Sequence, residues 1–292
     1  MITLAQKAPA ESKSSSDSMQ FKNILFPVDF SPQSEQIVPA VRDMVNRCRS
    51  RLTLLHAAET YGATGFDPSL AEGLVYFDEL LRREKDSLAA FQSAHFPSSN
   101  VNSTLEKGSP ARVIADYVKV HPVDLIMMPT HGYGTFRAAL LGSVTEKVIH
   151  DTHCPVWTSI HTEKIHNPVY PYRLIVCAID ELESSIPVIR KAGEIAAAFE
   201  SFLVLAHAVR SSEKRTESEI RSRLEQLGWS GEVSVPISIE AGDIVDVVTR
   251  TAVREGADLV IIGRGRSTEL LGSIRSHVFG IIRESPCPVL TL

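Results

Sequence analysis

Glycine and hydroxyl residues that could hold a phosphate group lie between residues 129 and 145. Gly132 closes the segment PTHG, and Gly142-Ser143 follow after nine intervening residues. The preceding run LIMM is typical of a strand buried on both faces, and VTEKVIH after Ser143 has apolar residues at helical spacing. The first N–H groups of a helix attract anions, and glycine lets a phosphate approach the backbone. The spacing therefore predicts a phosphate site where this strand ends and this helix begins.

The sequence lacks the motifs of other phosphate-binding sites and of common catalytic sites. A P-loop GXXXXGK[ST] is absent, as is a GXGXXG segment after a strand, and no GXSXG elbow surrounds Ser143. His131 could act as a general base, but no nucleophile is paired with it in the sequence, and a loop histidine more often shapes its loop. We find no carboxylate pair, metal cluster or catalytic triad, so the sequence predicts neither a catalytic residue nor a metal site. The glycines could also serve only to shape the connection between strand and helix.

The elements that would position this loop alternate between strand and helix. Ser31, followed by Pro32 and Glu35, has the signature of a helix start, and Asp29 directly follows an apolar strand. Strands are expected at 24–28, 52–57, 125–128 and 155–160, with a further strand that ends at 104–106, and helices are expected to begin near residues 31, 74, 111 and 143. This alternation favours an α/β fold with right-handed crossovers.

The same order recurs in the second half of the chain. YRLIVCAID matches FKNILFPVD, LVLAHA matches LTLLHA, and ADLVIIGRG matches VDLIMMPTHG. The matched blocks are 151 residues apart at Asp29 and Asp180 but only 133 apart at Cys154 and Cys287, so the second copy is shorter in its middle. The sequence predicts a disordered arm at 1–20, a first domain at 21–161, a linker at 162–169 and a second domain at 170–292. Met19 is a second candidate for the start of the chain.

These motifs resemble the nucleotide-binding branch of the universal stress protein family, whose signature is G-x2-G-x9-G-[ST]. Pro129 stands where the family has its first glycine, and proline has a fixed φ and no N–H. The resemblance covers both copies and implies two tandem doubly wound α/β domains. Each domain would have a five-stranded parallel sheet in the order 3-2-1-4-5, flanked by helices. The ligand would be ATP, alone or with Mg or Mn, in the crevice between strands one and four.

The resemblance also implies roles for individual residues. Asp29 would contact the adenine or the ribose, although a turn or helix-cap aspartate is an equally good interpretation of its position. The backbone of Ala57 would recognise adenine. His56 and its counterpart His207 follow apolar strand residues and are expected to be buried core histidines. The expected phosphate and ribose positions are Met128, His131, Gly132, Gly142, Ser143, Val144 and Thr145.

The second copy departs further from the signature. Its loop GRGR has one residue fewer between Gly263 and Gly265 than the family has, and Arg275 falls at the position of Gly142. We expect this copy to have lost or altered nucleotide binding and to serve as a pseudo-dimer partner. Its last strand, CPVLTL, would pair with CPVWTS of the first copy, as in the family's dimers, and a homodimer is also conceivable.

Composition narrows the remaining classes of function. The net charge of −5 and the lack of a basic cluster argue against a nucleic-acid partner. No apolar run approaches the ~20 residues that cross a bilayer. The four cysteines form no CXXC pair and are expected to be buried thiols of a cytoplasmic protein. Three functions remain open: ATP binding in a stress response, slow ATP hydrolysis, and a scaffold that binds no nucleotide.

Overall fold

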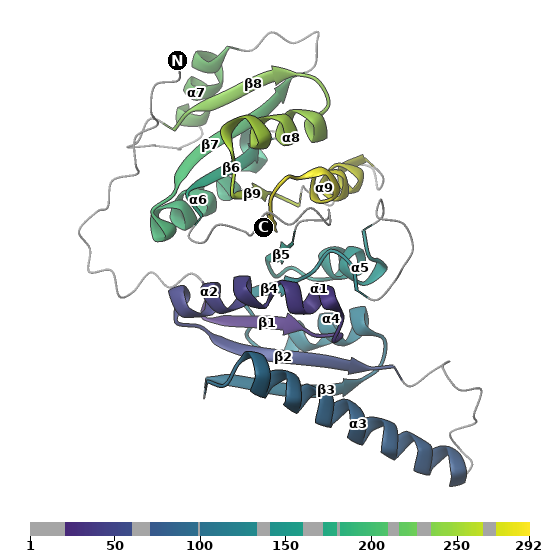
Figure 1. Ribbon diagram of the computed structural model, residues 1–292. Helices are drawn as coiled ribbons and strands as arrows, with labels where there is room; N and C mark the ends of the chain where they lie inside the picture. Colours follow the sequence, from purple (N-terminus) through teal and green to yellow (C-terminus); the bar gives the residue numbers. More distant parts are fainter. Residues whose placement is uncertain are drawn as a thin grey trace. The chain divides into compact units, whose positions relative to one another are not determined.

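The computed structural model divides into two compact units, which are described separately (Figure 1). One unit contains most of the described residues up to Val156, and the other contains those from Trp157 to Leu292 together with Leu141. The structure describes residues 21–59, 71–98, 100–132, 141–159, 172–179, 182–209, 216–226, 235–264 and 273–292. None of the helices in these stretches combines the length and the apolar composition that a bilayer crossing requires.

The first copy is a parallel sheet with connecting helices, as predicted. Its strands are β1 (Asn23–Pro27), β2 (Arg51–Ala58), β3 (Val101–Lys107), β4 (Leu125–Met128) and β5 (Val156–Thr158), in the order β3-β2-β1-β4-β5. Its helices are α1 (Pro32–Gln36), α2 (Val38–Cys48), α3 (Ala71–His95), α4 (Pro110–Val120) and α5 (Ser143–Asp151). All four residues of β4 are buried, which is the pattern of a central strand covered on both faces.

The first helical segment begins at the predicted cap but is interrupted by proline. Ser31 is the N-cap of α1, and its hydroxyl accepts the N–H of Ser34 at 3.2 Å. Ile37 then separates α1 from α2. Pro39 has no N–H to continue the hydrogen-bond ladder, which accounts for the break. The sequence predicted a helix start here but not the division into two helices.

The second copy repeats the strand order of the first. Its strands are β6 (Leu174–Ile179), β7 (Phe202–Val209), β8 (Ile237–Ala241), β9 (Leu259–Ile262) and β10 (Val289–Thr291), in the order β8-β7-β6-β9-β10. Its helices are α6 (Leu182–Phe199), α7 (Glu217–Gln226), α8 (Ile244–Glu255) and α9 (Ser273–Glu284). Figure 1 shows α8 beside β7 and β8 of this sheet.

Equivalent polar contacts recur in the two copies. The carboxylate of Asp124 accepts the backbone N–H of Asn23 at 2.8 Å, and that of Asp258 accepts the N–H of Leu174 at 3.1 Å. Each bond ties the start of the fourth strand of a copy to its first strand. The two halves therefore share side-chain contacts as well as strand order, which is expected of a duplicated domain.

Candidate functional site

The central strands β1 and β4 of the first copy are paired only near their amino ends. The pairs are Ile24 with Leu125 and Leu25 with Ile126, whereas β1 stays paired with β2 as far as Pro27. Parallel strands present their carboxyl ends at the same edge of a sheet, and ligands of doubly wound folds bind where the strand order reverses. The residues that follow β1 and β4 are therefore the first candidates for a site.

Asp29 and Gly132, both predicted as site residues, lie against each other at this edge. A Cβ atom built on Gly132 would lie 2.0 Å from Oδ2 of Asp29 and 3.2 Å from its Cγ. Only glycine can approach the carboxylate so closely, because any side chain would overlap it. The fold thus brings together residues that lie about a hundred positions apart in the sequence.

The two oxygens of the Asp29 carboxylate have different surroundings. Oδ1 accepts the backbone N–H of Ser31 at 3.0 Å and the hydroxyls of Ser31 and Ser34 at 2.6 Å each. Oδ2 faces Gly132, and we find no hydrogen bond to it from the residues that the structure describes. Asp29 is therefore a turn aspartate through Oδ1, while Oδ2 is left for another partner. The sequence had left both roles open.

Phe30 connects Asp29 to the helix through an unusual backbone conformation. Its φ is +59°, in the left-handed region that few non-glycine residues adopt. The ring lies 4.5 Å from the imidazole of His56 and 6.0 Å from the ring of Phe91, measured between centroids. Such conformations persist where surrounding contacts enforce them, and they concentrate at functional sites.

His56 and His207 are core residues, as predicted. Both are buried, and Nδ1 lies 2.7 Å from the Val28 carbonyl in the first copy and 3.1 Å from the Ile179 carbonyl in the second. Nε2 of His56 also lies 3.1 Å from a carboxylate oxygen of Glu84, a contact that the sequence analysis missed.

Ala57 lies at the carboxyl end of β2, next to the turn at Asp29. Pro27 pairs with Leu55, so extending this register by two residues places Ala57 beside Asp29. On its other side Ala57 pairs with Glu106 of β3. The position therefore agrees with a backbone contact to a ligand at this edge, which stays a prediction.

Two hydrogen bonds hold the start of α5 against the end of β4. The N–H of Gly142 donates to the Thr130 carbonyl at 2.8 Å, and the buried Thr145 hydroxyl donates to the Pro129 carbonyl at 3.1 Å. A Cβ on Gly142 would lie only 3.0 Å from the Thr130 carbonyl oxygen. Gly142 is thus needed for close packing, and its own N–H is already used within the protein.

Backbone donors for an anion must then come from the residues after Gly142. Ser143, Val144 and Thr145 form the first turn of α5, where N–H groups have no carbonyl partner inside the helix. Ser143 is exposed and Val144 is half-buried, so this turn can be approached from solvent. Met128 is buried in β4, and Nδ1 of the half-buried His131 lies 3.2 Å from the Thr130 hydroxyl.

The corresponding region of the second copy differs. Gly263 occupies the position of Pro129, and a Cβ there would lie 2.8 Å from a methyl group of Val188 on α6. The first glycine of the signature therefore packs against a helix in this copy. Residues 265–272 lie outside the described residues, so the prediction for Gly265 is not tested. Arg275 is the third residue of α9, which begins at Ser273, so the prediction that it takes the helix-capping position of Gly142 is wrong.

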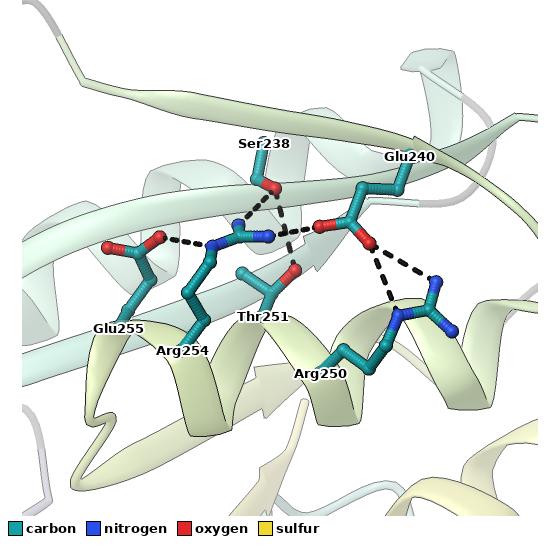
Figure 2. Close-up of polar contacts among 6 residues, drawn as sticks. All are labelled: Ser238, Glu240, Arg250, Thr251, Arg254 and Glu255. Atoms are coloured by element: carbon teal, nitrogen blue, oxygen red, sulfur yellow. Dashed lines mark hydrogen bonds and ion pairs between the residues drawn. The ribbon is translucent and has the colours of Figure 1, made fainter.

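A separate polar cluster joins β8 to α8 in the second copy (Figure 2). Glu240 accepts hydrogen bonds from Arg250 and Arg254, and Arg254 also donates to Ser238 and Glu255. The hydrogen bond from Arg254, followed by that from Arg250, lowers the pKa of Glu240. Because each arginine already has a carboxylate partner, we interpret the cluster as a tie between strand and helix.

The four cysteines belong to the buried core. All four cysteines are free and buried, as predicted. Burial raises the pKa of Cys177 and that of Cys287 to about 12, so both are protonated and unreactive at neutral pH.

The residues that the sequence analysis missed are Ser34, Phe30 and Glu84. A signal for Ser34 was available in the segment DFSPQS, because serines two and five positions after an aspartate can donate to it in a turn before a helix. Phe30 and Glu84 gave no such signal, since their contacts join different elements of the fold.

Comparison with known proteins agrees with these observations. The model of the universal stress protein family matches residues 20–159 and again 171–292. Universal stress protein MJ0531 of Methanocaldococcus jannaschii is 30% identical over 139 residues, which cover 47% of this chain and 80% of that protein. Universal stress protein Sll1654 of Synechocystis is 29% identical over 144 residues, covering 49% of this chain and 88% of that protein.

A solved structure extends the likeness to both copies. The crystal structure of a universal stress protein from Archaeoglobus fulgidus covers 92% of this chain and 97% of its own, with a TM-score of 0.69 and 21% identity. At this level of identity the match shows the fold, including the tandem arrangement of two domains.

Proposed function

The chain belongs to the universal stress protein family, in two tandem copies, and from this premise we propose that it binds ATP in the first copy. The observation that carries the proposal is the contact between Asp29 and Gly132 at the carboxyl ends of β1 and β4. A carboxylate oxygen without a described partner lies there, beside the strand edge at Ala57. This is the place where a doubly wound fold receives the base and sugar of a nucleotide.

The phosphates would lie at the start of α5. The bonds of Gly142 to Thr130 and of Thr145 to Pro129 hold this helix start next to the loop at His131 and Gly132. The N–H groups of the first turn, the helix dipole and the Ser143 hydroxyl then offer donors to an anion. Pro129 costs the loop one N–H donor, whereas its backbone carbonyl, which any residue would offer, accepts the Thr145 hydroxyl.

Mg²⁺ or Mn²⁺ would reach this site on the phosphates of the nucleotide. In the described parts of the chain, no group of three or more His, Cys, Asp or Glu residues could hold a metal ion. Among the described residues that directly follow β1 and β4, Asp29 is the one carboxylate. Two serine hydroxyls donate hydrogen bonds to one of its oxygens. Mg²⁺ usually keeps several water ligands and is bound through one or two carboxylates and the phosphates of the substrate.

We propose that the second copy binds no nucleotide and acts as the pairing partner of the first through the two last strands. The shortened loop after Gly263 changes the phosphate region of this copy. Calorimetric titration of the whole chain with ATP should therefore give one site per chain. Two sites of equal affinity would contradict the proposed loss of function in the second copy.

The phosphate position is tested by placing a negative charge on Ser143. Ser143→Asp adds an acid to the first turn of α5, which should leave the helix intact or stabilise it slightly. Two unit charges about 4 Å apart repel by about 1 to 4 kcal/mol, depending on the local dielectric. We therefore expect ATP to bind about tenfold or more weakly, and adenosine to bind as before.

Ser109→Asp is the matched control. Ser109 is the N-cap of α4 in the same copy, and the second copy has Asp243 at the corresponding position, so the fold accepts an acid there. This variant changes the net charge equally, but at the start of the helix that follows the outer strand β3. An ATP affinity that falls equally in both variants, or in neither, would remove α5 from the proposed phosphate site.

A further inference from the structure

We propose that Ser31 and Ser34 are positioning residues that make the two oxygens of Asp29 inequivalent, so that the site selects a ligand group that donates a hydrogen bond. The inference rests on the proposed nucleotide site and concerns its specificity. Oδ1 is held by the serines, and Oδ2 is the acceptor that meets the ligand.

Both serine hydroxyls donate their protons to the Asp29 carboxylate. Each hydroxyl carries one proton, and both point to Oδ1 of Asp29 at 2.6 Å. The Ser31 oxygen also accepts the N–H of Ser34, which fixes it as the helix cap. Ser31 is 0% exposed and Ser34 is 1% exposed, so water does not compete for these bonds. Together with the Ser31 N–H, three donors converge on a single oxygen.

Oδ2 has the opposite surroundings. It faces the α-carbon of Gly132, at a distance that no side chain could occupy, and it accepts no hydrogen bond from the described residues. Asp29 as a whole is only half-buried, so its outer oxygen can be reached. An ionised carboxylate only accepts, and therefore the ligand atom next to Oδ2 must carry a proton.

The second copy has half of this arrangement in its sequence. With the spacing of 151 residues, Ser185 corresponds to Ser34, whereas Leu182 corresponds to Ser31. The position of the helix-capping hydroxyl is thus apolar in the copy that we expect to have lost its site. The complete serine pair accompanies the copy that keeps Gly132, Gly142 and Ser143.

Replacing Asp29 by asparagine should exchange the hydrogen-bond acceptor that faces the ligand for a donor. The carboxamide has the shape of the carboxylate but offers one acceptor and one donor group. Three converging donors need an acceptor, so the Asn oxygen must turn to the serines and its NH₂ group to Gly132. Asp29→Asn would then present a donor to the ligand, with little change in shape.

The orientation can be measured without any ligand. In ¹⁵N-labelled Asp29→Asn, nuclear Overhauser contacts from the side-chain amide protons should reach the α-protons of Gly132. Contacts to the β-protons of Ser31 and Ser34 instead would overturn the inference, even if the nucleotide site itself is correct. Adding Ser34→Ala to this variant removes one of the three donors and should weaken the preference for the Gly132 side.

The specificity is measured with analogues that each lack one donor of ATP. ITP has a carbonyl group in place of the 6-amino group, and 2′-deoxy-ATP and 3′-deoxy-ATP each lack a ribose hydroxyl. We expect wild-type protein to bind one of the three about tenfold more weakly than ATP. That ratio should fall severalfold in Asp29→Asn and in Ser34→Ala, and the Ser34→Thr variant, which keeps the hydroxyl, should restore it.

Different results would refute the selection by Asp29 and the nucleotide site itself. Affinity ratios that are the same in all variants, together with tight ATP binding, would overturn the selection by Asp29 but keep the nucleotide site. Absence of ATP binding in the wild-type chain would refute the proposed function, and the Overhauser contacts in Asp29→Asn would still decide how the serines orient residue 29.

Discussion

Replacing Gly132 by alanine adds one methyl group where the structure leaves no room for it. The new Cβ would lie 2.0 Å from Oδ2 of Asp29, in a range that real Cβ contacts essentially never occupy. Either the loop must move by about 1 Å or the carboxylate must rotate away from its three donors. Each net hydrogen bond to a charged group contributes about 1.5 to 3 kcal/mol, and the protein will follow the less costly route. We therefore expect a loss of about 1 to 3 kcal/mol in the free energy of unfolding.

The same change should also impair nucleotide binding. Displacement of Asp29 or of the loop moves the acceptor oxygen from its place at the end of β1. We expect ATP affinity to fall by about tenfold or more, since a misplaced charged contact is worth more than 1.4 kcal/mol. Urea unfolding measures the first effect, and calorimetric titration with ATP measures the second.

Gly193→Ala provides the control for the loss of a glycine. Gly193 lies inside α6, and a Cβ there would meet nothing within 4 Å. Alanine is a better helix former, so this variant should gain up to about 1 kcal/mol of stability. If Gly132→Ala unfolds at the urea concentration of the wild type and keeps its ATP affinity, the contact between Asp29 and Gly132 does not exist as described.

Three further changes test other contacts. Thr145→Val removes the hydroxyl that satisfies the Pro129 carbonyl and should cost about 1 to 3 kcal/mol in urea unfolding; an unchanged midpoint would contradict a buried bond. Glu240→Gln should cost only about 0.5 to 1 kcal/mol at neutral pH, because its arginine partners are half-exposed. Since the pKa of Glu240 is lowered in the folded state, the difference from wild type should be complete above the ordinary value of 4.5 and should disappear as the pH falls below it; a difference that persists in acid would refute this origin. Trp157→Pro removes an N–H donor from the last strand of the first copy and should separate the two copies, so an unchanged envelope in small-angle scattering of a soluble variant would refute docking through that strand.

The sequence determined the architecture of each copy. Buried strands such as LIMM are continuous apolar runs, and the alternation of such runs with amphipathic helices permits few topologies. The order 3-2-1-4-5, which the structure confirms, was implied by the family resemblance. The alternation of strand and helix, its repetition and the helix starts at Ser31 and Ser143 could be predicted from the chain itself. These are local signals, and each depends on residues that are neighbours in the chain.

The roles of individual atoms were decided only by the tertiary structure. The sequence suggested that Gly142 leaves its backbone open to a phosphate, yet its N–H bonds the Thr130 carbonyl and its α-carbon packs against the loop. It also left two roles open for Asp29, and the structure divides the surroundings of the two oxygens between them. Contacts between residues a hundred positions apart depend on how closely β1 and β4 approach and which way their last side chains point. Those distances are set by the packing of the whole sheet and its helices, so no pattern of neighbouring residues specifies them.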